Sequence, residues 1–246
     1  MAEIERWFSL KGGIHIPVMK GQSAAAAKKA FFDSKHGKAV SNLASKKTIT
    51  GKTSSASKKT EVFKDSQGNR MEVRNAEPKE FKQALDAAKA SRPKDDGWRV
   101  DNYSHTEADY SKDALFITKR GSVIAITPEG DIISVCGKKT GNRDTEDRGR
   151  SIMEYAVKNG GKKLDSYSGN HGFYVKCGFE PVSYCKFDEK YAPPGWRKGI
   201  DAPEPIIFYK YTGKTTTSGD YKEALKNIKM SKDYDSAQAK RDKEVK

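Results

Sequence analysis

The sequence predicts an α/β domain that carries basic extensions at both ends. From about residue 77 onward, stretches with the alternating apolar pattern of strands are interspersed with stretches whose apolar residues lie three and four apart, as in helices. The charge is also uneven, because residues 1–60 hold +9 of the net charge of +14, whereas residues 101–211 hold only +1. A nearly neutral folded domain between charged segments accounts for both observations.

The composition limits the class of protein. Only 35% of the 246 residues are hydrophobic and the mean hydropathy is −0.84, so part of the chain is expected to stay outside a packed core. The start "MAEIERWFSLKGG" lacks the layout of a signal peptide, and no long apolar run follows, which predicts a cytoplasmic protein without membrane contact. Three cysteines without a C-x-x-C pair and four scattered histidines predict neither disulfides nor a metal site.

The N-terminal part predicts a small structured segment, residues 1–33, followed by a flexible basic linker, residues 34–62. Alternating Ile14, Ile16 and Val18 indicate a strand, and a helix is expected from Ser23 to about Phe32. The linker "SNLASKKTITGKTSSASKKTE" contains too few apolar residues to bury a core. It is either a solvated spacer or a weak, salt-sensitive contact for nucleic acid.

The domain itself is expected over residues 63–211. "EPKEFKQALDAAKAS" predicts an amphipathic helix, and "GWRVDNYS" a short strand. Ser122–Thr127 and Ile132–Cys136 flank the turn sequence "PEGD", so they predict a β-hairpin. Five further elements are a helix in "GRSIMEYAVKNGG", a strand in "KKLDSYS", a short helix in "HGFYVKCG", and one strand each in "EPVSYCKF" and "EPIIFYKYT". Residues 212–246 predict a charged tail, helical through Met230 and then an interaction or disordered end.

The block from Gly121 to Tyr211 resembles the GNAT superfamily of N-acetyltransferases. A glycine-bearing loop opens a helix at Arg148–Ser151, and Tyr174 stands five residues before Phe179 in a Tyr followed by a Gly-Phe pair. The resemblance implies a mixed, mostly antiparallel central sheet flanked by helices. It also implies acetyl-CoA as the cofactor and transfer of an acetyl group to an amine of a protein or a small molecule.

Two stretches, "IHIP" and "GGKKLDSYSGNHGFYVKCGFEPVS", resemble proteins encoded by phages and prophages of Gram-positive bacteria. This second resemblance implies a phage setting, with the protein in the host cytoplasm or in the virion. It bears on origin rather than on chemistry.

The family resemblance implies specific roles for residues of the site. The helix start would hold the pyrophosphate of the cofactor through its amides and dipole, and the residues expected there are Arg148, Gly149, Arg150 and Ser151. The backbone at Ile133 and Val135 would pair with the pantetheine and support the oxyanion. Asn170 either contacts the cofactor or caps the following helix. Tyr174 would donate a proton or a hydrogen bond to the leaving thiolate, unless it is a core aromatic.

Two features leave the mechanism open. The candidates for the general base are His171, which titrates nearest neutrality, Asp165, Asp131 and a chain of water molecules. Glu146 stands where the family pattern has Gln or Arg, and its charge would repel pyrophosphate unless it points away; Arg143 is a candidate for the missing cation. The alternative function is therefore a catalytically inactive GNAT-like binding or virion-associated protein.

Overall fold

The computed structural model describes residues 4–10, 14–19, 60–92, 106–192, 196–201 and 203–245. The chain forms two compact units, Met1–Ser57 and Lys58–Lys246. In the first unit, β1 (Ile4–Leu10) pairs antiparallel with β2 (Ile14–Met19). β2 is the strand that the sequence predicted, whereas β1 was not foreseen. The helix expected from Ser23 to Phe32 lies outside the described residues, as does most of the expected linker.

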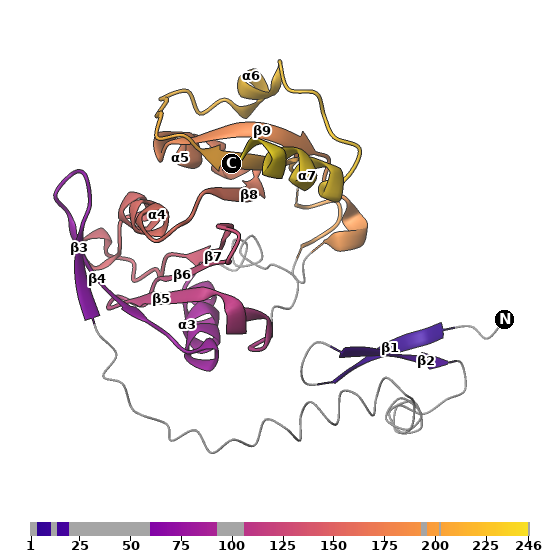
Figure 1. Ribbon diagram of the computed structural model, residues 1–246, viewed down its shortest axis with the longest axis horizontal. Helices are drawn as coiled ribbons and strands as arrows, with labels where there is room; N and C mark the ends of the chain where they lie inside the picture. Colours follow the sequence, from indigo (N-terminus) through magenta and orange to yellow (C-terminus); the bar gives the residue numbers. More distant parts are fainter. Residues whose placement is uncertain are drawn as a thin grey trace. The chain divides into compact units, whose positions relative to one another are not determined.

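The second unit contains a five-stranded and a three-stranded sheet (Figure 1). The larger sheet has the order β3 (Thr60–Lys64), β4 (Arg70–Asn75), β5 (Ala114–Thr118), β6 (Val123–Ile126), β7 (Ile132–Cys136), and the smaller one the order β8 (Lys163–Tyr167), β10 (Ile206–Tyr211), β9 (Phe179–Cys185). Every ladder in both sheets is antiparallel. The mixed α/β class and the mostly antiparallel sheet flanked by helices are therefore confirmed.

The two sheets meet at a single point. An isolated parallel bridge joins Asp131, just before β7, to Lys163, the first residue of β8. No ladder continues from this bridge among the described residues, so β7 and β8 start together and then separate. This separation opens the space that holds the candidate site.

Helices cover both faces of the five-stranded sheet. α3 (Pro78–Ala90) lies on one face and α4 (Gly149–Lys158) on the other, as Figure 1 shows. Because side chains alternate along a strand, Leu115 and Ile117 of β5 pack in the cluster of α3, and Phe116 between them packs in the cluster of α4. The sequence predicted both helices from this apolar periodicity.

The hairpins show where the prediction succeeded and where it failed. β6 and β7 form the predicted hairpin, and Gly130 in its turn has a φ of +83°, which favours glycine. The hairpin of β3 and β4 was not predicted. Because β3 begins at Thr60, the expected domain boundary at residue 63 was wrong and falls inside a strand. The strand expected in "GWRVDNYS" lies outside the described residues.

The C-terminal segment belongs to the folded unit. α6 (Tyr221–Leu225) buries Leu225, and α7 (Tyr234–Glu244) packs against β9 and β10 with Ala237 and Arg241 buried. α6 lies within the stretch predicted to be helical through Met230, whereas the alternative of a disordered end after it was wrong, because α7 is a packed helix. None of the described helices is long and apolar enough to cross a membrane.

The three cysteines are free and buried, and each lies in a different apolar cluster. Cys136 belongs to the cluster under α3, Cys177 to the cluster under α4, and Cys185 to the cluster under α7.

Candidate functional site

A cleft of about 1550 Å³ opens where β7 and β8 separate. Its walls combine strands of both sheets with the helices beside them. They include Ile132–Val135 of β7, Asp165–Tyr167 of β8, Gly149 at the start of α4, Tyr174 of α5 (His171–Lys176), and Tyr234 of α7. The structure thus brings together Ile133, Val135, Gly149, Asn170 and Tyr174 of the predicted site.

A bulge shapes the wall formed by β7. The register between β6 and β7 shifts between Val123 and Ala125, and Ser134 opposite has a φ of +51°, unusual for a residue other than glycine. The Ser134 Oγ lies 2.6 Å from the Tyr110 hydroxyl, which anchors this conformation. Among the described residues, β7 pairs with β6 along one edge, while its other edge faces the cleft beyond Asp131. Backbone N–H and C=O groups of β7 are therefore available to a ligand.

The start of α4 supplies a second set of backbone donors. The first amides of a helix have no partner within the helix, and they carry its partial positive charge. Arg148 at the N-cap makes no side-chain cap, and the first turn contains no acidic residue. A Cβ atom on Gly149 would lie 2.9 Å from the ring of Phe173, so the half-exposed Phe173 ring lies over this helix start.

Three side chains predicted at the helix start point elsewhere. Ser151 is buried and donates a hydrogen bond to Asp65 in the β3–β4 turn. Arg150 pairs with Glu154 on its own helix at 2.9 Å. Arg148 is exposed and does not line the cleft. Their predicted side-chain contacts with a phosphate have no support in this geometry, although their amides lie at the helix start.

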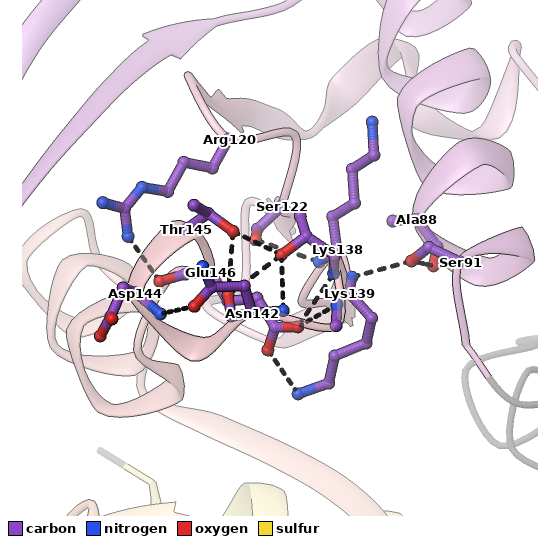
Figure 2. Close-up of polar contacts among 12 residues, drawn as sticks. Ala88, Ser91, Arg120, Ser122, Lys138, Lys139, Asn142, Asp144, Thr145 and Glu146 are labelled. Carbon is purple, nitrogen blue, oxygen red and sulfur yellow. Dashed lines mark hydrogen bonds and ion pairs between the residues drawn. The ribbon is translucent and has the colours of Figure 1, made fainter.

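Glu146 does not direct its carboxylate at the helix start. The carboxylate accepts hydrogen bonds from the backbone of Thr140 at 2.9 Å and of Gly141 at 3.3 Å, and it pairs with Lys139 Nζ at 3.0 Å, as Figure 2 shows for Lys139 and its neighbours. These contacts, with the Thr140 amide first, lower the pKa of Glu146. Its negative charge is thus compensated within the loop, so the departure from the family pattern carries less weight.

Tyr174 presents its hydroxyl to the cleft beside β8. The hydroxyl hydrogen-bonds with Ser166, whose Oγ also accepts from Asn170 Nδ2 at 3.0 Å. The ring packs against Phe173 at 5.1 Å and Tyr209 at 5.6 Å between centroids. Burial raises the pKa of Tyr174 to about 12, and the charge of Asp165 adds to this effect while the Ser166 contact opposes it. The phenol is therefore a hydrogen-bond donor at any ordinary pH.

Asn170 lines the cleft as predicted, and His171 does not. Asn170 stands at the N-cap position of α5, but its side chain makes no cap hydrogen bond. His171 is 1% exposed, its Nδ1 lies 3.2 Å from the Tyr209 hydroxyl, and it does not line the cleft. Burial lowers the pKa of His171, while the charge of Asp220 opposes this. The geometry does not favour His171 as the base.

The two aspartates named as alternative bases both line the cleft. Asp131 is held by two cations, with Oδ1 at 2.7 Å from Arg241 Nη2 and Oδ2 at 3.2 Å from Lys163 Nζ. Asp165 lies farther from Arg241, at 3.8 Å, and hydrogen-bonds with the Tyr234 hydroxyl. Burial raises the pKa of Asp165 to about 6, against the opposing effects of Arg241 and Tyr234.

Charged side chains of both signs line the cleft. Beside the end of β7 and the start of α4, the basic residues Arg92, Lys138 and Lys139 lie together with Glu146 and Asp147. The Nε of Arg92 is buried and has no hydrogen-bond partner among the described residues. Along the rest of the cleft, acidic residues outnumber the basic Lys186 and Lys232; they are Asp131, Asp165, Asp188, Glu189, Glu204, Asp233 and Asp235.

No family model, curated protein or solved structure matches the chain.

Sequence reasoning missed Ser166, Arg92, Tyr234 and Arg241. No short-range signal marks them, because each gains its place only when distant elements pack together. Ser166 lies inside β8, and nothing in the sequence of that strand distinguishes it from its neighbours.

Proposed function

We propose that the protein is an acetyl-CoA-dependent N-acyltransferase of the GNAT type, in a phage or prophage setting. The observation that carries the proposal is the separation of the parallel strands β7 and β8 after a single bridge at Asp131 and Lys163. The resulting cleft has backbone donors on one wall and a phenol on the other. This arrangement suits a thioester inserted between two strands.

The residues of the cleft fit the proposed cofactor. The free edge of β7 at Ile133 and Val135 can pair with the amides of pantetheine, and the amides at the start of α4 can hold pyrophosphate. Arg92 and Lys138 add positive charge where an anionic group would enter, whereas the charge of Lys139 is paired with Glu146. When bound, acetyl-CoA supplies the activated acetyl group.

Tyr174 has the role of stabilising the departing sulfur. A hydroxyl whose pKa is about 12 stays protonated and can donate a hydrogen bond to a thiolate as it forms. Ser166 and Asn170 orient it from the adjacent strand and loop. The aromatic contacts with Phe173 and Tyr209 hold the ring in place.

One observation favours the second candidate, a GNAT-like protein that binds a partner without catalysis. The Phe173 ring covers the start of α4, where a Cβ atom at Gly149 would already be too close. A pyrophosphate can reach these amides only if the exposed ring turns aside. A cofactor-free binding protein would need no such movement.

Calorimetric titration of the full chain with acetyl-CoA separates the two candidates. We expect saturable binding, accompanied by release of free thiol when a panel of amines is added. A titration that stays silent up to about 1 mM acetyl-CoA, the upper end of the usual KM range of enzymes, would overturn the enzyme proposal. Binding without thiol release would favour the inactive alternative.

Substitution Tyr174→Phe tests the phenol separately from the ring. We expect turnover to fall by roughly ten- to ten-thousandfold, the range for a lost acid or donor, because only the oxygen is removed. Stability should change little, since the aromatic contacts persist, whereas a loss of about 1 kcal/mol with unchanged turnover would identify Tyr174 as a core aromatic. Acetyl transfer and thermal unfolding are measured on the same preparations, and normal turnover in the variant would exclude the assigned role.

A further inference from the structure

The carboxylate of Asp165 occupies a distinctive place in the cleft. It projects from β8 one residue before Ser166, the residue that holds the Tyr174 hydroxyl, and therefore from the opposite face of the strand, the face on which its partner Phe208 and α7 pack. Its negative charge contributes to the raised pKa of Tyr174, so the two groups lie within electrostatic reach of each other. Its side chain is 28% exposed, which leaves it open to a ligand in the cleft.

The other candidate bases are less suited to accept a proton. Both oxygens of Asp131 face cations, Arg241 at 2.7 Å and Lys163 at 3.2 Å, and its side chain is 17% exposed. His171 is buried against Tyr209, away from the cleft. Asp165 has its nearest cation at 3.8 Å, so it is held without being fully neutralised.

The C-terminal helix supplies the groups that hold Asp165. Arg241 is 0% exposed and reaches Asp131 and Asp165 from α7, and Tyr234 at the start of the same helix hydrogen-bonds with Asp165. A guanidinium with no exposure is costly to bury unless its charge has partners that require it. Its Nε donates to the neighbouring Asp242 at 2.9 Å, and the two cleft aspartates at its tip supply the remaining partners.

We propose that Asp165 accepts the proton of the incoming ammonium group, and that Tyr234 and Arg241 of α7 position its carboxylate for this task. The inference rests on the proposed acyl transfer and names the base of that same site. The acidic residues along the β8 and α7 side of the cleft favour the approach of a cation, which is the form in which an amine arrives at neutral pH.

The proton balance of the step is complete. The ammonium group gives one proton to Asp165, and its nitrogen then forms a bond to the acetyl carbonyl carbon. The carbon–sulfur bond breaks, the sulfur keeps the electron pair, and it takes a proton through Tyr174. The nitrogen loses a second proton to water. Tyr174 regains a proton from water and Asp165 releases its own, so one proton is released overall.

The charged and titratable groups that face Asp165 come from four neighbouring parts of the fold. They are Arg241 and Tyr234 of α7, Asp131 before β7, Tyr174 of α5 and Cys185 of β9. Arg241 and the Tyr234 hydroxyl favour the ionised carboxylate, whereas burial and Asp131 oppose it. Removal of the Tyr234 hydroxyl should therefore raise the pKa of Asp165.

The test is a pH profile of acetyl transfer by the full chain, with acetyl-CoA and a lysine-like amine. The wild type should lose kcat/KM below about pH 6 and level off above it, because Asp165 titrates there. In Asp165→Asn, the rate at neutral pH should fall by about 10²- to 10⁴-fold, while acetyl-CoA affinity is kept. The residual rate should rise steadily toward the pKa of the amine, about 10.4, because only neutral amine can then react.

Two further variants separate a positioning role from a structural one. Tyr234→Phe should shift the acidic limb of the profile to higher pH and recover most activity on the alkaline side. Glu244→Gln is the matched control, because it breaks only the Lys210–Glu244 pair of 3.0 Å on the same helix and should leave the profile unchanged.

The outcomes distinguish this inference from the proposed function. If Asp165→Asn is active with a normal pH profile, the role of Asp165 is overturned. If the acidic limb does not move in Tyr234→Phe, the positioning role of α7 is overturned. Both results leave acyl transfer standing. A wild type that neither binds acetyl-CoA nor releases thiol overturns both.

Discussion

α4 and α7 both wall the cleft, but different forces hold them in place. α4 buries Ile152, Met153, Tyr155 and Ala156 against the sheet, with Tyr155 edge-on to Phe63 and Phe116 at 5.3 and 5.2 Å. α7 buries only Ala237 and Arg241. Its attachment is largely polar. The contacts that hold it are the ion pairs of Arg241 with Asp131, of Lys163 with Asp242 and of Lys210 with Glu244, and the hydrogen bond that Ser183 donates to the Ala237 carbonyl.

This difference in contacts predicts how the attachment of each helix responds to salt and pH. Apolar burial is non-directional and nearly indifferent to salt and pH, so α4 can serve as a fixed support for the anion-binding end of the cleft. Ion pairs depend on protonation, and those near the surface weaken with salt. The wall with the acidic residues is therefore the one that solution conditions can loosen.

The largest expected effect follows from Arg241→Ala. We expect a loss of about 3–5 kcal/mol in the free energy of unfolding at pH 8, because the partly buried Asp131 and Asp165 lose the fully buried cation that they share. The loss should shrink at pH 5, where these carboxylates can take up protons instead. Denaturant unfolding at the two pH values measures both. Lys243→Ala, an exposed control on the same helix, should change stability by less than about 0.5 kcal/mol. An equal loss in both variants would contradict the role of Arg241.

Met153→Ala tests the apolar contacts that hold α4. Met153 is 0% exposed in the cluster under α4, so its truncation should cost about 3 kcal/mol, within the usual range for a buried methionine. This loss should be the same at low and high salt, and at pH 5 and pH 8, because no charge is removed. Unfolding curves under the four conditions test the expectation. A strong dependence on salt would mean that α4 is also held by charge.

The pH dependence of stability gives a smaller effect, visible in Asp165→Asn. Because the pKa of Asp165 is about 6 in the folded protein against 3.8 for the ordinary group, the folded state binds its proton more tightly than the unfolded chain. The stabilisation is complete below about pH 4 and is lost as the pH rises through 6. Relative to the variant, the wild type should therefore lose about 2–3 kcal/mol between pH 4 and pH 7. A difference that stays flat across this range would show that Asp165 titrates normally.

The elements that the sequence predicted are those with their own apolar pattern. Phe81, Leu85 and Ala88 repeat at helical spacing and are all buried in α3. β3 escaped prediction because only Phe63 of its five residues is buried, so it lacks the alternation of a half-buried strand. α7 escaped for a similar reason, since its partners Asp131 and Asp165 lie far earlier in the chain.

The candidate site was predictable where backbone geometry defines it. Gly149, Ile133 and Val135 were named from the family resemblance and all line the cleft, as does Tyr174. Side-chain direction was harder to predict. Glu154 stands four residues after Arg150, which is the spacing of an ion pair along one helix. This spacing was a signal that the Arg150 side chain does not belong to the phosphate site. Nothing in the sequence around His171 indicates that it turns toward Tyr209 rather than the cleft.

Because one cysteine lies in each of three apolar clusters, the reactivity of each thiol can report when its cluster opens to solvent. Burial raises the pKa of Cys177 and Cys185 to about 11 and also raises that of Cys136, so few thiolates exist in the closed protein. Alkylation of each thiol must then wait for its layer to open. Cys185 lies under the ion-paired α7 and should react first. Its labelling rate in the unaltered protein should therefore report how readily that helix detaches at each pH and salt concentration.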